Sequence, residues 1–266
     1  MEFERFLVVF DPTSDEQPAL DRARILAGQL DASIHLYACI NEEQSTGGDR
    51  AATLAAFEVR LEAAAQPLRD DGLNVTTQVT WSNDWYKCSV KAAEDSAADL
   101  VLKSSFSHSR SQRVFKRTSD WTLIRECAAP VMLVKDGDER DLDKVLVAVD
   151  GRREQVSSNE ANARLLDISS RLIERDNVEV HVLSTSDKLS NMPDRAALSR
   201  LTGVPGERLH IRVGDADDLI IELAESLHVG TLIIGNSKRS GVTAALNNNT
   251  IERVLDRLDC DLVAIH

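Results

Sequence analysis

The sequence contains Phe6-Leu7-Val8-Val9-Phe10-Asp11 near its start and repeats the pattern as Val145-Leu146-Val147-Ala148-Val149-Asp150. Each stretch is a continuous apolar run that ends in an aspartate. An uninterrupted run of this kind is typical of a parallel strand that is buried on both faces of a sheet. The two stretches therefore predict a buried strand at the same place in two similar domains.

Three further pairs of apolar stretches follow in the same order. They are Ser33–Tyr37 with Glu179–Leu183, Asp99–Lys103 with Thr231–Gly235, and Pro130–Lys135 with Asp261–His266. Four echoes in one order are hard to produce by chance, so the chain is predicted to be a tandem repeat of one domain. The polar segment 136–141 is the natural boundary, which gives a first domain of residues 1–137 and a second of residues 142–266.

Amphipathic helical patterns lie between the predicted strands. Strands that alternate with helices through short connections predict an α/β fold, with an open parallel five-stranded sheet and helices on both faces in each half. The predicted helices include 15–30, 49–69, 119–126, 158–174, 194–201, 217–227 and 250–258, and the remaining strands are 74–81 and 208–213.

Composition and charge exclude several classes of partner. The formal net charge of −13 repels nucleic acid and anionic lipid, so we expect neither as a partner. No stretch approaches the roughly 18 apolar residues of a membrane-spanning helix. The N-terminus has no basic segment followed by a long apolar one, so we expect a cytoplasmic location.

The residues also give no sign of catalytic or metal chemistry. Glycine-rich dinucleotide fingerprints, Walker loops, nucleophile elbows and His-Glu-x-x-His spacings are all missing from the sequence. We therefore predict no catalytic residue, no metal site and no enzyme. His35 and His181 occupy matching positions and are interpreted as packed strand histidines. The four cysteines form no Cys-x-x-Cys pair, and we expect free, mostly buried thiols at Cys39, Cys88, Cys127 and Cys260.

The loop after the fourth strand of the second half is the main candidate for binding. It runs from Gly235 to Thr250 and leads directly into an apolar helical pattern. Open α/β sheets bind ligands beyond the carboxyl ends of their strands, where this loop and Asp150 are expected to lie. In such a loop, glycines let main-chain N–H groups approach phosphate oxygens, and the helix N-terminus adds partial positive charge.

The chain resembles the universal stress protein family, and in particular its tandem, two-domain, E-type bacterial members. Nucleotide-binding members of that family carry Gly-x2-Gly-x9-Gly-[Ser/Thr] between strand four and the last helix. The resemblance covers nearly the whole chain and implies an adenine nucleotide alpha-hydrolase-like, Rossmann-like fold in each half. The local matches are Asp11-Pro12, Gln17-Pro18-Ala19-Leu20, Leu100-Val101-Leu102-Lys103, Asp120-Trp121 and Cys260-Asp261-Leu262.

The resemblance implies an ATP or AMP site in the second domain. Lys238 replaces the second glycine of the motif, where it either blocks the approach of a phosphate or supplies an ammonium to it. Asn248 replaces the third glycine, and asparagine tolerates left-handed backbone better than most residues. The residues that the resemblance assigns to this site are Asp150 near the nucleoside, Val182 facing the base, and Gly235, Lys238, Asn248, Asn249 and Thr250 around the phosphates.

The first domain departs further from the family pattern. Lys103 stands where the opening glycine is expected, and no glycine follows before Trp121, so family-mode nucleotide binding is not expected there. The segment is locally basic, which is consistent with a solvated loop or with an anion site built from side chains. Its charged residues are Lys103, Arg110, Arg113, Lys116 and Arg117, and the second-domain loop has Lys238 and Arg239.

The resemblance implies a non-catalytic, small-ligand-binding stress-response factor. Two alternatives stay open, namely a nucleotide-free interaction protein with closed pockets and a binder of another anionic or acylated metabolite. The family pairs its domains through their last strands. This implies an intramolecular pseudo-dimer with Val131–Lys135 and Leu262–His266 at its seam, or a further homodimer of chains.

Overall fold

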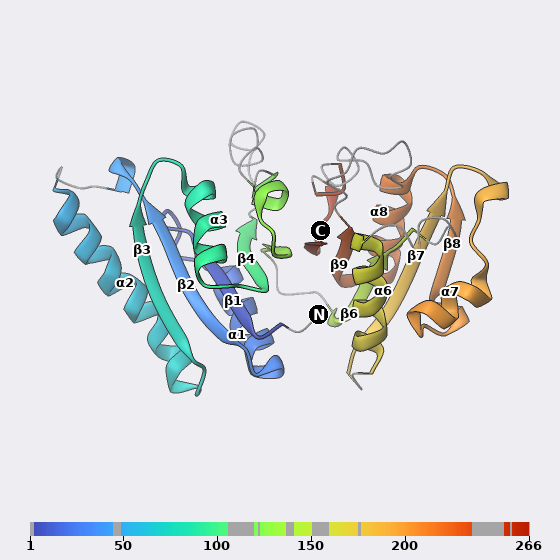
Figure 1. The fold of residues 1–266 in the computed structure, drawn as a ribbon, viewed down its shortest axis with the longest axis horizontal. Helices are drawn as coiled ribbons and strands as arrows, with labels where there is room; N and C mark the ends of the chain where they lie inside the picture. The colour runs from blue at the N-terminus through green and yellow to red at the C-terminus, as the bar shows by residue number, and fades with distance from the viewer. Residues whose placement is uncertain are drawn as a thin grey trace. The chain divides into compact units, whose positions relative to one another are not determined.

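The structure, a computed structural model, describes residues 3–44, 49–105, 120–121, 123–136, 141–150, 160–174, 177–235, 253–255 and 257–265. The chain divides into two compact units, Glu2–Asp136 and Gly137–His266. Each unit is a parallel five-stranded sheet with helices packed against it, as the alternation of apolar stretches predicts (Figure 1).

In the first unit the strands lie in the order β3-β2-β1-β4-β5, and all neighbouring pairs are parallel. β1 is central, and the direction of the strand order reverses between β1 and β4. The elements are β1 (Arg5–Phe10), α1 (Pro18–Leu30), β2 (Ser33–Ile40), the 3-10 helix Glu42–Gln44, α2 (Arg50–Asp70), β3 (Val75–Trp81), α3 (Trp85–Asp95), β4 (Leu100–Ser105) and β5 (Val131–Lys135).

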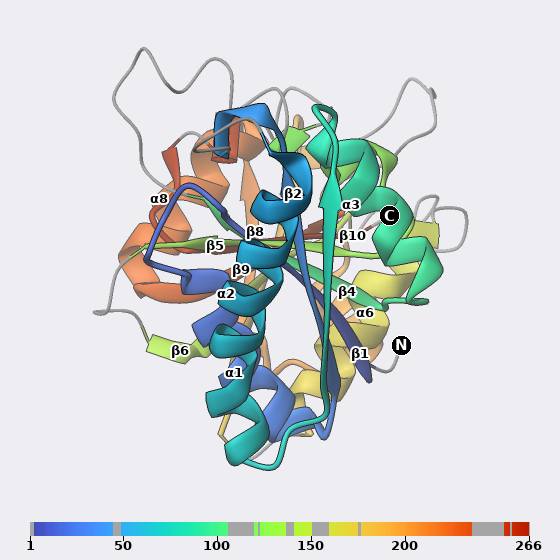
Figure 2. The same cartoon turned by 90° about the vertical axis from the view of Figure 1, so that its left-hand side faces the viewer.

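Helices cover both faces of this sheet. α1 and α2 lie on one face and α3 lies on the other (Figure 2). Successive residues of a strand point to opposite faces of the sheet, so the side chains of β3 face the two helical layers in turn. Thr77 donates a hydrogen bond to Glu62 of α2, whereas Thr76 and Gln78 bind the ring of His35 on the other face.

In the second unit the order is β10-β9-β6-β7-β8, again with parallel neighbours and with β6 at the centre. The elements are β6 (Asp141–Ala148), α6 (Glu160–Ile173), β7 (Glu179–Ser186), the 3-10 helix Leu189–Asn191, α7 (Arg195–Thr202), the 3-10 helix Gly206–Arg208, β8 (Leu209–Val213), α8 (Ala216–Leu227), β9 (Val229–Gly235) and β10 (Asp261–Ile265).

Most predicted elements are present with boundaries that differ by one or two residues. The strands β2 and β7 end three residues later, and β6 begins four residues earlier, than the predicted stretches. The helix predicted at 15–30 begins only at Pro18. Gln17 has φ −127° and ψ 65°, which is not helical, and its side chain binds the backbone of the preceding loop. Proline at the first helical position needs no N–H partner, so the helix begins there without cost. The last helices contain residues 120–126 and 253–257, apart from 122 and 256, which are not described.

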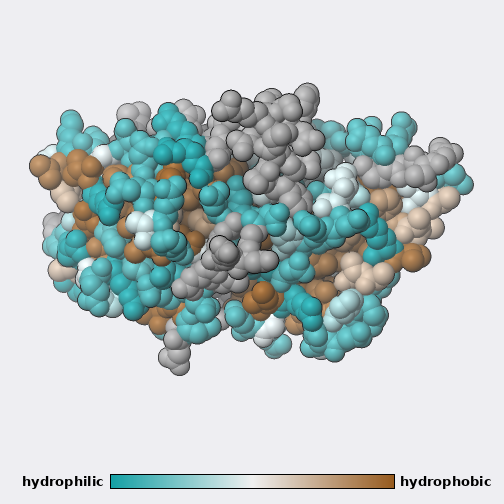
Figure 3. All heavy atoms as spheres, turned by 180° about the vertical axis from the view of Figure 1, so that it is seen from behind, coloured by the Kyte–Doolittle hydropathy of each residue, from teal (hydrophilic) through white to brown (hydrophobic). Residues whose placement is uncertain are grey.

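The core of each unit is its sheet. Leu7 and Val8 of β1 and Leu146 and Val147 of β6 are completely buried, as expected for central strands covered on both faces. Figure 3 shows one face of the molecule, where hydrophilic side chains predominate and hydrophobic ones are scattered among them. Within the described ranges, no helix is both long enough and apolar enough to cross a membrane.

The strand histidines occupy equivalent positions, because Leu7 pairs with His35 and Leu146 with His181. His181 is buried, as predicted for a packed strand histidine. Its Nδ1 lies 3.1 Å from Nε2 of His210 on β8, and its Nε2 lies 2.7 Å from Oε1 of Glu179. The two imidazole rings are stacked, with centroids 5.3 Å apart.

This stack makes the stability of the second unit depend on pH. Burial, together with the electrostatic effect of the neighbouring His181 and two arginines, lowers the pKa of His210 to about 4. A histidine in the unfolded chain has a pKa of about 6.5. Between these values the unfolded state binds a proton that the folded state does not, so stability falls as the pH falls.

We predict that the second unit loses stability between pH 7 and pH 5.5, measured by urea unfolding, and that His210→Gln flattens this dependence. Glutamine keeps a polar group beside His181 but does not titrate. His228→Asn, at an exposed helix end, should keep the wild-type pH profile. An unchanged profile in His210→Gln would contradict the assignment.

Candidate functional site

The carboxyl ends of β6 and β9 lie side by side at the point where the strand order of the second unit reverses. Asp150 follows β6, and Gly235 is the last residue of β9. The register pairs Ala148 with Ile234, so Asp150 and Gly235 come to the same edge of the sheet. This is the edge at which open α/β sheets bind ligands.

Val182 lies further inside the sheet than these two residues. It pairs with Val147 on one side and Leu209 on the other, and its side chain is completely buried. Lys238, Asn248, Asn249 and Thr250, which the family resemblance assigns to phosphate binding, fall outside the described residues. Within the described residues, no group of three or more His, Cys, Asp or Glu side chains could hold a metal ion.

Asp150 is held by a side-chain amide rather than by a neighbouring strand. Asn162 of α6 accepts a hydrogen bond from the backbone N–H of Asp150 at 2.8 Å and donates one to its carbonyl oxygen at 2.8 Å. Asn162 is only 2% exposed, and Asp150 is 8% exposed. The N–H and carbonyl groups of Asp150 are therefore both hydrogen-bonded although they are buried, and this fixes the position of its Cα atom.

The first unit repeats this arrangement at the equivalent aspartate. Gln17 accepts a hydrogen bond from the N–H of Asp11 at 3.0 Å and donates one to its carbonyl oxygen at 2.9 Å. We call the two arrangements the amide pairs. Sequence reasoning missed them as site residues. The available signal was a polar residue at the start of a helix that otherwise packs apolar residues against the sheet.

The strand register corrects one part of the sequence comparison. Lys103 pairs with the residue two places before the strand-one aspartate, and Ile234 holds the same place in the second unit. Lys103 therefore matches Ile234, and Ser104 is the residue that matches Gly235. The expectation that Lys103 replaces the opening glycine is wrong by one residue, because a continuous apolar strand contains no marker of its register.

Gly235 has a packing role that does not involve a ligand. A Cβ atom at this position would lie 3.1 Å from Cδ1 of Leu165 and 3.6 Å from Cβ of Ala161, both on α6. Glycine thus allows α6 to pack closely against the end of β9.

Ser104 fills the corresponding place in the first unit. Its side chain is 3% exposed, and its Oγ accepts a hydrogen bond at 3.1 Å from the backbone N–H of Ala19, in the first turn of α1. This N–H has no partner within the helix, so the serine hydroxyl satisfies it. The first unit therefore uses a side chain where the second unit has none.

Lys103 points to the other face of the first sheet, where it is paired. Its Nζ lies 2.8 Å from Oδ1 of Asp120, and these side chains are only 15% and 9% exposed. The ammonium also donates to the carbonyl of Ser104 at 2.9 Å and lies 5.1 Å from the ring centroid of Trp85. A lysine this fully engaged is not available to a ligand anion. The other basic residues of this segment lie outside the described residues.

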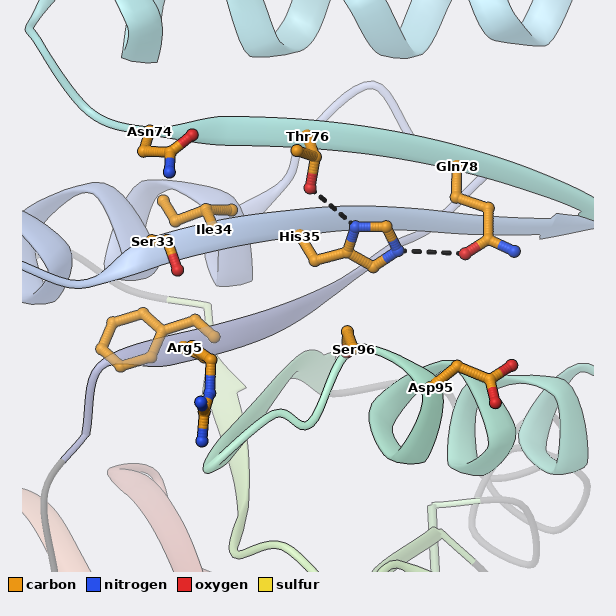
Figure 4. Close-up of a pocket in the computed structure, with 10 residues that line it drawn as sticks. Arg5, Ser33, Ile34, His35, Asn74, Thr76, Gln78, Asp95 and Ser96 are labelled. Atoms are coloured by element: carbon orange, nitrogen blue, oxygen red, sulfur yellow. Dashed lines mark hydrogen bonds between the residues drawn. The ribbon is translucent and has the colours of Figure 1, made fainter.

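A groove of about 350 Å³ lies on the α3 face of the first sheet, near the amino ends of its strands. His35 lies at its centre, with Nδ1 2.8 Å from Thr76 Oγ1 and Nε2 3.0 Å from Gln78 Oε1 (Figure 4). Both ring nitrogens therefore have partners. The groove lies at the end of the sheet opposite to the one where Asp11 is found.

We predict that Gly235→Ala lowers the free energy of unfolding of the second unit by about 1 to 3 kcal/mol. Leu165 is 2% exposed and has little room to move away from the added methyl group. Gly28→Ala is the matched control, because Gly28 lies within α1 with nothing within 4 Å of its Cβ position. That change should stabilise the first unit by about 0.5 to 1 kcal/mol. Urea unfolding measures both, and a neutral Gly235→Ala would contradict the packing role.

Comparisons with known proteins agree with this architecture. The model of the universal stress protein family matches residues 2–135 and 194–266. Universal stress protein E of Escherichia coli K12 is 28% identical over 99% of this chain and 94% of its own length. The homologue of that protein in Haemophilus influenzae is 26% identical over 100% of this chain and 98% of its own length.

Solved structures show the same fold. A functionally unknown protein of Pseudomonas aeruginosa PAO1 covers 98% of this chain and 92% of its own length, with 27% identity and a TM-score of 0.76. A universal stress protein of Archaeoglobus fulgidus covers 99% and 96%, with 17% identity and a TM-score of 0.78. With its two parallel α/β units and the family match in both, the chain belongs to the universal stress protein family.

Proposed function

We propose that the second unit binds an adenine nucleotide, ATP or AMP, and that the protein acts as a cytoplasmic, non-catalytic stress-response factor. The observation that supports this most directly is the position of Asp150 and Gly235 at the same edge of the second sheet, at its switch point. An acidic side chain and the start of a loop at one strand edge suit a ligand that has hydroxyl groups at one end and phosphates at the other.

The Asp150 carboxylate supplies acceptors for ribose hydroxyl groups. Its backbone is already fixed by Asn162, so little conformational freedom is lost when a nucleoside binds. Gly235 begins the phosphate-binding segment, to which we also assign Lys238, Asn248, Asn249 and Thr250. In this proposal the Lys238 ammonium attracts a phosphate by its charge, in place of the close main-chain contact that a glycine would allow. Val182 lies in the buried strand β7, and in this proposal its backbone faces the adenine base.

The first unit is proposed to lack a nucleotide site and to act as a scaffold. The Asp11 carboxylate already accepts hydrogen bonds from N–H and Oγ1 of Thr13, at 2.8 and 2.6 Å. Arg60 of α2 also lies across the loop that follows, donating to the carbonyl oxygens of Pro12 at 3.0 Å and Ser14 at 2.8 Å. With Ser104 at the position of the glycine, this edge is occupied by the chain's own groups.

We predict that millimolar ATP or AMP raises the unfolding temperature, measured by differential scanning fluorimetry. A ligand at 100 times its Kd stabilises by about 2.7 kcal/mol, which gives a clear shift. Asp150→Ala should weaken binding in calorimetric titration by tenfold or more. The amide pair at residue 150 uses only backbone atoms of the aspartate, so the variant keeps both hydrogen bonds to Asn162.

Asp11→Ala is the matched control and should bind nucleotide as the wild type does. Lys238→Ala separates the two roles of that residue, because weaker binding supports a phosphate contact and tighter binding supports a blocked approach. The proposal fails if millimolar nucleotide gives no shift and native mass spectrometry of freshly purified protein finds no nucleotide. A different bound mass would instead favour another anionic or acylated metabolite.

A further inference from the structure

Two cysteines that are far apart in sequence meet in the first unit. Cys39 is near the end of β2, and Cys88 is in the first turns of α3, the helix that covers this face of the sheet. A side-chain hydrogen bond joins their thiols, and Cys39 Sγ also lies 3.5 Å from the carbonyl oxygen of Ser82. The pair is not evident from the sequence, because spacing along the chain reveals only local cysteine motifs.

The two thiols differ in accessibility. Cys39 is 7% exposed, whereas Cys88 is only half-buried and can be reached from solvent. Burial, together with the neighbouring Cys88 thiol, raises the pKa of Cys39 to about 12, so Cys39 stays protonated at neutral pH. Tyr37 lies in the same cluster, and burial likewise raises the pKa of its hydroxyl. Cys88 is therefore the thiol that a small oxidant meets first.

We propose that Cys39 and Cys88 form a peroxide-sensitive dithiol that closes to an intramolecular disulfide. The Cys88 sulfur attacks one oxygen of hydrogen peroxide, the O–O bond breaks, and Cys88 becomes a sulfenic acid while one water leaves. The hydroxide that leaves Cys88 takes the proton of the Cys39 thiol as the Cys39 sulfur attacks the Cys88 sulfur, so the S–S bond forms, the S–O bond breaks and the second water leaves. Two thiols are oxidised by two electrons, and one peroxide is reduced to two waters.

The disulfide would connect β2 covalently to α3. It crosses the face of the sheet that also holds the buried Lys103–Asp120 pair and Trp85. Oxidation would thus fasten the helix on this face without touching Asp150 or Gly235. The dithiol is independent of nucleotide binding, so either proposal can fail without the other.

The test is peroxide treatment of the reduced full-length protein, followed by alkylation of free thiols and mass spectrometry. We expect the intact mass to fall by about 2 Da, two alkylation sites to be lost, and a cross-linked peptide to join residues 39 and 88. Dithiothreitol should restore both sites. The oxidised protein should also unfold at a higher temperature than the reduced one, because the cross-link restricts the unfolded chain.

The other two cysteines supply the controls. Cys127 and Cys260 are 1% and 5% exposed, and a variant carrying Cys127→Ala and Cys260→Ala should form the same cross-link. Cys88→Ser should abolish it, and Cys39→Ala should leave a Cys88 sulfenic acid that dimedone traps. The proposal is wrong if wild-type Cys39 and Cys88 both stay alkylatable, if Cys88 passes directly to the sulfinic acid, or if the cross-link joins other cysteines.

Discussion

The central strand of each unit, β1 or β6, is the constraint on which the rest of the unit depends. It is hydrogen-bonded to a parallel strand on both sides and covered by helices on both faces, so the residues in its C-terminal part have almost no exposed surface. A buried strand of this kind cannot shift without breaking two ladders at once. The position of its C-terminal end is therefore fixed by the core, and so is the position of the aspartate that follows.

Much of the fold follows from the sequence because buried parallel strands are visible as apolar runs. The repeated order of strands and the equivalence of His35 and His181 are confirmed by the pairing registers. The match between Lys103 and Gly235 failed for the same physical reason that made the strands visible. A continuous apolar run looks the same when it is shifted by one residue, and only hydrogen bonding to a neighbour sets the register.

Features formed by contacts between distant segments were beyond the reach of the sequence. Gln17 lies six residues after its aspartate and Asn162 lies twelve after, so no common spacing links the two amide pairs. The contact between Cys39 and Cys88 depends on how α3 lies on β2, which no local motif records. Arg60 likewise reaches the β1–α1 loop from another helix. Tertiary geometry decides such contacts, and local residue patterns do not.

The amide pairs have a consequence for how these units can vary. In both units a side-chain amide binds the backbone of the aspartate in the same way, although the amide lies at a different distance along the chain. The geometry at the aspartate is therefore independent of the length of the connection. Loop closure costs rise only slowly with length. Units of this fold can therefore differ in the length of this connection while the strand end keeps its form.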